Sequence, residues 1–161
     1  MSRLRLLAFV AVAGTGLPAA AAGQTLTIAG PADTVTVTAS QLAALPRETV
    51  RARIHEDPER AWTGVQLHQL IKLVKYPIDS LRGRRLSDVL VAEAADGYRA
   101  IFSLAELAPD LGGRGALLVD RADGAPLPAT DGPFRLLVPY ETRPTRWVRQ
   151  VVRLRIVSIP Q

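Results

Sequence analysis

The sequence contains no cysteine and only two histidines, His55 and His68. Without cysteine, the chain forms no disulfide bond and offers no thiolate as a nucleophile or metal ligand. Two histidines are too few for a histidine-rich zinc site, so we predict no metal-ligating residues. We interpret His68, beside Leu67 on a predicted helix, as a partly buried spacer. His55, on the polar side of a predicted strand, either contacts a ligand or is solvated.

Short motifs that mark common enzyme classes are also missing. Residues 112–115 (Gly-Gly-Arg-Gly) follow a predicted helix, whereas phosphate-binding and dinucleotide-binding loops join a strand to a helix. No serine lies in the Gly-x-Ser-x-Gly context of a nucleophile elbow. Glu56, Asp57 and Glu59 fall in one predicted loop, which is typical of a solvated acidic turn. We therefore assign no catalytic residue from motifs.

Neither sign of charge is in large excess. The chain has 20 basic and 15 acidic residues, for a formal charge of +5, and every basic residue except Lys72 and Lys75 is an arginine. Loss of Arg3 and Arg5 with a leader would reduce the charge to +3. A balance this small does not indicate a nucleic-acid-binding protein.

The N-terminus has the composition of a secretory signal peptide. Arg3 and Arg5 form a basic start, an apolar run extends from Leu4 to Leu17, and Ala20 to Ala22 supply the small residues of a cleavage site. The run is short for the roughly 20 residues of a membrane-spanning helix, and no comparable run follows. We therefore predict a signal peptide over residues 1–23 and a periplasmic or secreted protein with no membrane span after cleavage.

Residues 24–161 have the length of a single domain of ordinary size. Alternating apolar residues predict strands, and apolar residues three and four apart predict helices. The expected strands cover residues 26–28, 35–37, 50–54, 88–94, 98–102, 116–121, 134–138 and 151–157, and residues 57–60 are expected to form a loop. The expected helices cover residues 39–45, a segment from Gly64 to the Tyr76-Pro77 pair, and a short segment after Ser103.

Capping-box pairs support two of these helices, because Thr38 is followed by Gln41 and Ser103 by Glu106 at the required spacing. Short strands interleaved with a few short helices predict an α+β fold with mixed or mostly antiparallel sheets. Regular βαβ alternation is missing, so a doubly wound parallel sheet is not expected.

A basic stretch near the C-terminus is the most informative local feature. It contains one acid, Glu141, and the arginines Arg135, Arg143, Arg146, Arg149, Arg153 and Arg155. Arg143, Arg146 and Arg149 surround Trp147 between two predicted strands, where their guanidinium groups either bind a phosphate or carboxylate or remain solvated. We interpret Arg153 and Arg155 as the solvent face of an edge strand, kept charged to prevent edge pairing.

Seven segments occur in an order that resembles a known family. They are residues 62–67 (Trp-Thr-Gly-Val-Gln-Leu), 95–98 (Ala-Asp-Gly-Tyr), 103–107 (Ser-Leu-Ala-Glu-Leu), 117–120 (Leu-Leu-Val-Asp), 123–128 (Asp-Gly-Ala-Pro-Leu-Pro), 131–139 (Asp-Gly-Pro-Phe-Arg-Leu-Leu-Val-Pro) and 146–149 (Arg-Trp-Val-Arg). Together they resemble the molybdopterin-binding domain of the sulfite oxidase family, which includes the periplasmic protein-methionine-sulfoxide reductase catalytic subunits. The resemblance extends over roughly Thr25 to Val157 and implies a sulfite-oxidase-like molybdopterin-binding fold.

The resemblance also implies a site. In the family, the sheet of this domain holds molybdopterin, and basic residues after the Val-Pro strand contact its phosphate or the substrate anion. By position, Arg146 and Arg149 inherit that role, with Arg143 as a weaker candidate. The family's molybdenum-ligating cysteine ends the strand before the Trp-Thr-Gly-Val segment. In this chain that strand carries His55, which completes the predicted cofactor-binding set, and no cysteine.

Three function classes remain open. The first is an exported oxidoreductase that holds molybdopterin with an oxygen or nitrogen ligand from the protein and is served by an exported or membrane redox partner. The second is a noncatalytic exported module that binds another anionic ligand through the same arginines. The third is a protein that docks on another exported protein through its sheet surface near Trp62 or Trp147. The resemblance favours the first class and the missing cysteine the second, since a fold does not determine a function.

Overall fold

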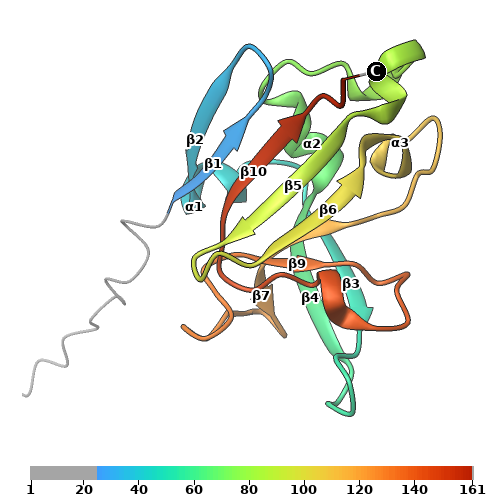
Figure 1. Ribbon diagram of the computed structural model, residues 1–161. Coiled ribbons are helices and arrows are strands. Elements are labelled where there is room, and N and C mark those ends of the chain that lie inside the picture. The colour runs from blue at the N-terminus through green and yellow to red at the C-terminus, as the bar shows by residue number, and fades with distance from the viewer. Residues whose placement is uncertain (1–24, 161) are drawn as a thin grey trace, which may run out of the picture.

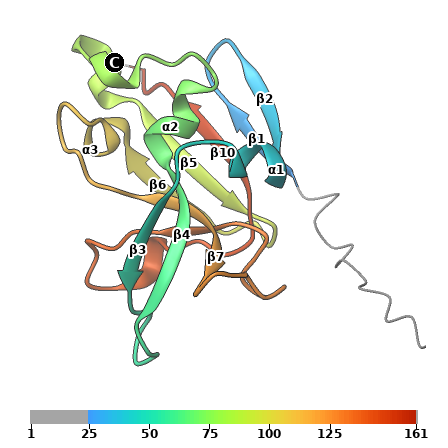
Figure 2. The same cartoon turned by 180° about the vertical axis from the view of Figure 1, so that it is seen from behind.

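The computed structural model describes residues 25–160, and the predicted signal peptide lies outside the described residues. These residues form two five-stranded sheets with short helices between and beside them. Figure 1 looks onto the first sheet, and Figure 2, from behind, brings α2, β3 and β4 to the front. Among residues 25–160, no helix has both the length and the apolar character needed to span a membrane.

The first sheet has the strand order β2-β1-β10-β5-β6. Its strands are β1 (Thr25–Ala29), β2 (Thr34–Thr38), β5 (Val89–Ala94), β6 (Arg99–Ser103) and β10 (Val151–Val157). The two predicted hairpins, β1 with β2 and β5 with β6, are confirmed as antiparallel pairs. β10 lies parallel to β1 and antiparallel to β5, so the two hairpins are joined through the last strand of the chain.

The predicted edge position of Arg153 and Arg155 is wrong. Both residues lie on β10, which occupies the centre of the first sheet with a strand on either side. The error has a physical cause, because β10 pairs with β1 across almost the whole described chain and no local pattern reports a pairing of such sequence separation.

The second sheet has the order β3-β4-β7-β8, with β9 also paired to β7. Its strands are β3 (Glu48–Ala52), β4 (Arg60–Gln66), β7 (Leu117–Ala122), β8 (Ala125–Pro126) and β9 (Arg135–Leu137). β4 was not predicted, because its residues were divided between an expected loop and the start of an expected helix. A Cβ at Gly64 would collide with the backbone of Leu118 and Val119, so glycine permits the close approach of β7 to β4.

The helices are short and are set by local signals. They are α1 (Ala39–Ala43), α2 (Leu67–Lys72), α3 (Leu104–Leu107) and the 3-10 turns η2 (Ile78–Ser80), η3 (Gly83–Ser87) and η4 (Pro144–Arg146). Both predicted capping boxes are present, at Thr38 for α1 and Ser103 for α3. The helix expected from Gly64 begins only at Leu67 and ends at Lys72.

The hydrophobic core lies between the inner faces of the two sheets. Its largest fully buried side chains are Trp62 of β4, Phe102 of β6 and Phe134 just before β9. Leu67, Leu70 and Ile71 place the apolar face of α2 in the same core, as their spacing predicts. The structure is therefore a mixed α+β fold with a few short helices, as expected.

Candidate functional site

A cleft of about 830 Å³ opens where loops of both sheets meet, and we name it the Arg135 cleft. Its walls come from the loop after β3, the start of β4, the β5–β6 turn, the segment before β9 and the segment between η4 and β10. The charged or titratable side chains that line it are those of His55, Asp57, Arg60, Asp96, Tyr98, Asp131, Arg135 and Arg149. Four stretches of the chain, residues 54–62, 94–98, 130–135 and 144–150, thus contribute to one cleft.

Arg135 is the buried charge of this cleft, with only 8% of its side chain exposed. One terminal nitrogen, Nη1, donates to the Asp131 carboxylate at 2.8 Å, and the guanidinium lies 5.7 Å from the centre of the Trp62 ring. The Nε–H is buried and has no hydrogen-bond acceptor among the described residues. A buried donor without a partner costs about 1–3 kcal/mol, so an acceptor supplied from outside the chain would stabilise it.

The pKa of Arg135 reflects burial and three charged neighbours, Asp131, Arg149 and Asp57. Burial lowers the pKa of its guanidinium, and the Asp131 carboxylate raises that pKa in part. The positive charge of Arg149, which lines the same cleft, lowers it further. Because arginine keeps its proton even when its pKa falls, the cleft presents three positive guanidinium groups, those of Arg60, Arg135 and Arg149. Arg135 is paired with Asp131 and Arg60 with Asp123, whereas Arg149 has no ion pair within residues 25–160.

The ring of Trp62 is the apolar surface against which the Arg135 guanidinium packs. Trp62 is 1% exposed, its indole nitrogen donates to the backbone oxygen of Ala52 at 3.1 Å, and the Arg60 guanidinium lies 5.4 Å from the ring centre. Arg60 in turn donates to Asp123 at 2.8 Å, and this hydrogen bond holds the pKa of the Asp123 carboxyl below its usual value. Trp62 therefore lies within cation–π range of two arginines.

Hydrogen bonds from Gln150 hold the segment that contains Arg149 against the segment that precedes Arg135. The Gln150 backbone nitrogen donates to the Asp131 backbone oxygen at 2.9 Å, and its side-chain nitrogen donates to the Ala129 oxygen at 2.7 Å. These bonds tie the segment before β10 to the segment before β9. Arg149 is exposed, lines the cleft and has no ion pair with any residue between 25 and 160.

Two cleft residues have left-handed backbone conformations. His55, in the loop after β3, has φ 51°, and Gln150 has φ 49°. Such values are uncommon for residues other than glycine and are concentrated at functional sites. Both residues line one cleft, which adds a backbone observation to the charged side chains.

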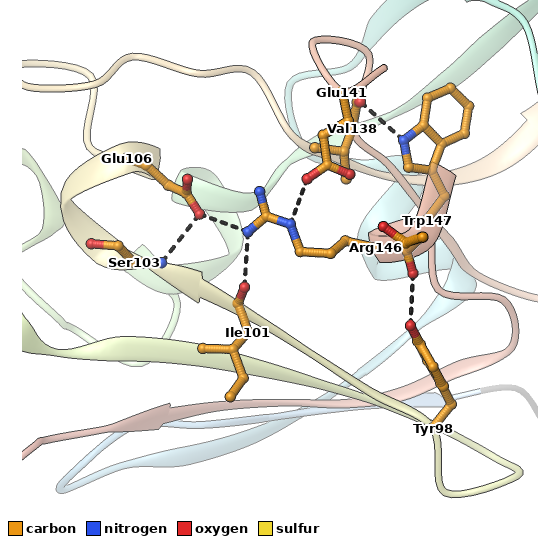
Figure 3. A network of polar contacts seen from close by, with 9 residues as sticks. Tyr98, Ile101, Ser103, Glu106, Val138, Glu141, Arg146 and Trp147 are labelled. Carbon is orange, nitrogen blue, oxygen red and sulfur yellow. Dashed lines mark hydrogen bonds and ion pairs between the residues drawn. The ribbon is translucent and has the colours of Figure 1, made fainter. Parts of the chain in front are cut away.

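The predicted site residues fall into two groups. The structure brings His55 and Arg149 to the Arg135 cleft, whereas Arg143 and Arg146 do not line it. Arg143 is exposed at the start of η4. Arg146 contacts Glu141 at 2.5 Å, Glu106 at 3.0 Å and the Ile101 backbone oxygen at 2.9 Å, as Figure 3 shows.

The Arg146 guanidinium also lies 4.4 Å from the centre of the Phe102 ring. Burial lowers the pKa of Arg146, but its hydrogen bonds to the two carboxylates outweigh burial and raise that pKa overall. In the same network, Tyr98 donates to the Thr145 oxygen at 2.8 Å and Trp147 donates to the Val138 oxygen at 2.9 Å. These bonds hold η4 between β6 and α3.

Neither Arg60 nor Arg135 was among the site residues predicted from the sequence. Arg135 lies within the apolar run 134–138, and an arginine in the middle of a buried strand was a usable signal of a buried, functional charge. Arg60 carried no comparable signal, because its position depends on β4, which was not predicted.

The donors of the cleft fit the phosphate group of molybdopterin, but the chain lacks the ligand for its metal. The unpartnered Nε–H of Arg135, with Arg149, fits a phosphate group. The chain has no thiolate for the metal, and the described residues contain no group of three or more His, Asp or Glu side chains arranged to hold an ion. The cleft therefore offers guanidinium donors for an anionic group, beside the carboxylates of Asp57, Asp96 and Asp131, and does not reproduce the cysteine ligation that the family resemblance implies.

Comparisons with known proteins show a similarity of fold. No family model matches the chain, and no curated protein matches it in sequence. Among solved structures, it is similar to the sulfane dehydrogenase SoxCD from Paracoccus pantotrophus, with 20% identity and a TM-score of 0.66. The match covers 84% of this chain and 38% of that one, so the chain spans well under half the length of its structural neighbour. The chain thus has the sulfite-oxidase-like α+β fold that its sequence predicted.

Proposed function

We propose that this protein is a binding module that captures an anionic, phosphate-bearing ligand in the Arg135 cleft. The observation that carries the proposal is the buried Nε–H of Arg135, which has no acceptor among the described residues and lies in a cleft that also contains Arg149. A phosphate oxygen would interact with both guanidinium groups, and a turn of the buried Arg135 side chain toward the cleft would let it accept from Nε as well.

The geometry favours a localised anion over a diffuse one. Asp131 already holds one side of the Arg135 guanidinium, and Trp62 lies beneath it, so the direction of the remaining donor is restricted. Arg149 is exposed and its long side chain has room to close on a ligand. One buried, oriented arginine and one adaptable arginine suit a single phosphate group better than an extended polyanion.

Molybdopterin is the specific ligand that the family resemblance suggests. The fold relation to a sulfane dehydrogenase supports this at the level of fold, and the arginines support binding of the pterin phosphate. The cleft offers no support for oxo-transfer by a cysteine-ligated metal, because the chain has no cysteine. We therefore propose binding, with catalytic competence reduced or lost relative to the family.

An oxidoreductase is the second candidate, and the position of His55 favours it. Its imidazole lines the same cleft as Arg149 and lies on the loop that ends the strand before Trp62, where the resemblance implies the metal ligand. This candidate includes an exported or membrane redox partner. It predicts stoichiometric molybdenum and pterin in protein purified from a host that loads other molybdoenzymes, and loss of the metal in His55→Ala.

The binding proposal is tested by titrating the purified protein with pyrophosphate in a calorimeter. Arg149→Ala is expected to weaken binding about tenfold, the size of one charge-assisted hydrogen bond. Arg143→Ala is the matched control, because it removes an exposed arginine six residues away that does not line the cleft. Equal losses in both variants, or no binding by the unaltered protein, would contradict the assignment.

Export is part of the proposal and rests on the N-terminal sequence. Arg3, Arg5, the apolar run and Ala20 to Ala22 support a cleaved signal peptide. We expect N-terminal sequencing of protein from its native host to start near Gly23 or Gln24 and fractionation to recover it outside the cytoplasm. A full-length N-terminus on cytoplasmic protein would overturn the export proposal and leave ligand binding untouched.

A further inference from the structure

The outer face of the first sheet carries a charged cluster whose residues do not line the Arg135 cleft. Glu93 of β5 lies between Arg153 of β10 and Arg99 of β6, since both are its directly paired neighbours in the sheet. Arg155, two residues along β10, points to the same side. We name Glu93, Arg99, Arg153, Arg155 and the neighbouring Ile101 the Glu93 patch.

One carboxylate serves three guanidinium groups in this patch. Glu93 lies 3.3 Å from Arg99, 3.7 Å from Arg153 and 3.6 Å from Arg155. The contacts to Arg153 and Arg155 exceed hydrogen-bonding distance. They are ion pairs that leave the N–H groups of both arginines without a hydrogen bond to Glu93. Each guanidinium has five donors. The patch has a formal excess of two positive charges and many N–H groups that face solvent.

Glu93 is the enclosed member of the cluster and the arginines are the accessible ones. The Glu93 side chain is 13% exposed, whereas those of Arg99, Arg153 and Arg155 are 64%, 51% and 42% exposed. The three guanidinium groups therefore surround the Glu93 carboxylate, and their remaining N–H donors face solvent. This arrangement also limits the rotamer freedom that such side chains would lose on binding a partner.

An apolar residue adjoins the charges. Ile101 of β6 is 58% exposed and pairs with Val91 of β5, which in turn pairs with Arg155. Figure 1 looks onto this face, and no described helix or strand covers β10, β5 or β6 on the viewer's side. An exposed isoleucine beside a cluster of arginines has the composition of a protein-interface centre rather than of ordinary solvent-exposed sheet.

We propose that the Glu93 patch docks an acidic segment of a protein partner. Carboxylates of the partner would take the free guanidinium donors in fork geometry, and an apolar side chain between them would cover Ile101. Charge complementarity determines the occupant. A second copy of this face would bring like charges together. An anionic membrane is recognised by clusters of 4–8 basic residues, more than this patch contains.

The test uses a fluorescein-labelled peptide of alternating glutamate and leucine, measured by fluorescence anisotropy with the purified protein. Binding is expected at low salt and should weaken as salt rises. The double variant Arg153→Gln/Arg155→Gln should weaken it at least tenfold. Arg82→Gln/Arg84→Gln removes two exposed arginines of the η3 region and is the matched control, expected to bind as the unaltered protein does.

Glu93→Gln supplies the reverse test. It removes the internal carboxylate that competes for the arginines, so peptide affinity should rise several-fold. A role for Glu93 in folding alone predicts no such gain. Arg149→Ala should leave peptide binding unchanged, which separates this surface from the Arg135 cleft.

Three outcomes would overturn the proposal. The first is no peptide binding at low salt. The second is an equal loss of peptide affinity in the η3 control variant. The third is tight binding of phosphatidylglycerol vesicles that depends on Arg153 and Arg155 while the peptide does not bind. The last outcome would assign the patch to a membrane surface. None of them bears on pyrophosphate binding in the Arg135 cleft.

Discussion

The guanidinium of Arg135 lies 5.7 Å from the centre of the Trp62 ring, and both side chains are buried where the cleft meets the core. This contact connects the hydrophobic core with the cleft that we propose as the binding site. Trp62 belongs to the hydrophobic core, whereas Arg135 presents an unpartnered donor beside the cleft. Binding and stability should therefore be separable by substitutions on either side of this contact.

Trp62→Ala should lower the free energy of unfolding by about 3–5 kcal/mol, the range for removing a large buried aromatic side chain. The substitution also leaves the Ala52 oxygen without its indole donor. Urea denaturation followed by circular dichroism measures the change. Ile101→Ala, at an exposed sheet position, is the control and should change stability by less than about 0.5 kcal/mol. A loss that small for Trp62→Ala would show that the indole is not part of the core.

Arg146→Ala should reduce stability by about 2 kcal/mol and leave pyrophosphate affinity unchanged. Its guanidinium joins Glu106, Glu141 and the Ile101 oxygen, and its removal leaves two partly buried carboxylates close together. Denaturation and calorimetry on the same variant measure the two effects. The opposite result, intact stability with lost binding, would return Arg146 to the anion site that the family resemblance implied.

Gly64→Ala should be the most damaging small substitution, at about 4 kcal/mol or failure to fold. The added Cβ would collide with the backbone of Leu118 and Val119, which belong to the neighbouring strand and have no freedom to retreat. Gly97→Ala is the contrasting change, because Gly97 has φ 86° with open space around it and should cost only about 1 kcal/mol of backbone strain. Soluble yield and thermal melting distinguish the two variants.

Asp123 predicts a pH dependence on the acid side. The hydrogen bond from Arg60 lowers the pKa of the Asp123 carboxyl, so the folded state releases this proton more readily than the unfolded state. The stabilisation is present above the unfolded pKa and is lost as pH falls through the folded one, which places the change below about pH 4. Asp123→Asn should therefore differ from the unaltered protein at neutral pH and converge with it in acid. Urea midpoints measured across this range, at low and high salt, test the expectation.

Local features of the fold were predictable because their causes lie within a few residues. The capping box at Thr38 and Gln41 specifies the start of α1 through side-chain hydrogen bonds to adjacent backbone groups. The hairpins were predicted in the same way, from alternation and turn residues. β4 was missed because the apolar residues Trp62, Val65 and Leu67 are spaced in a pattern that suits a strand or a helix, and only pairing with β3 and β7 decides between them.

The sequence by itself determined which chemistry is available to this chain: no thiolate, two imidazoles and an arginine-rich C-terminal stretch. It also determined the α+β class, since alternation, spacing and caps are properties of short segments. Only the tertiary structure decided which arginines act together. It buried Arg135 against Trp62, brought Arg149 and His55 to the same cleft and engaged Arg146 elsewhere. These outcomes depend on pairings such as β1 with β10, between residues more than a hundred positions apart, and local sequence carries no record of such contacts.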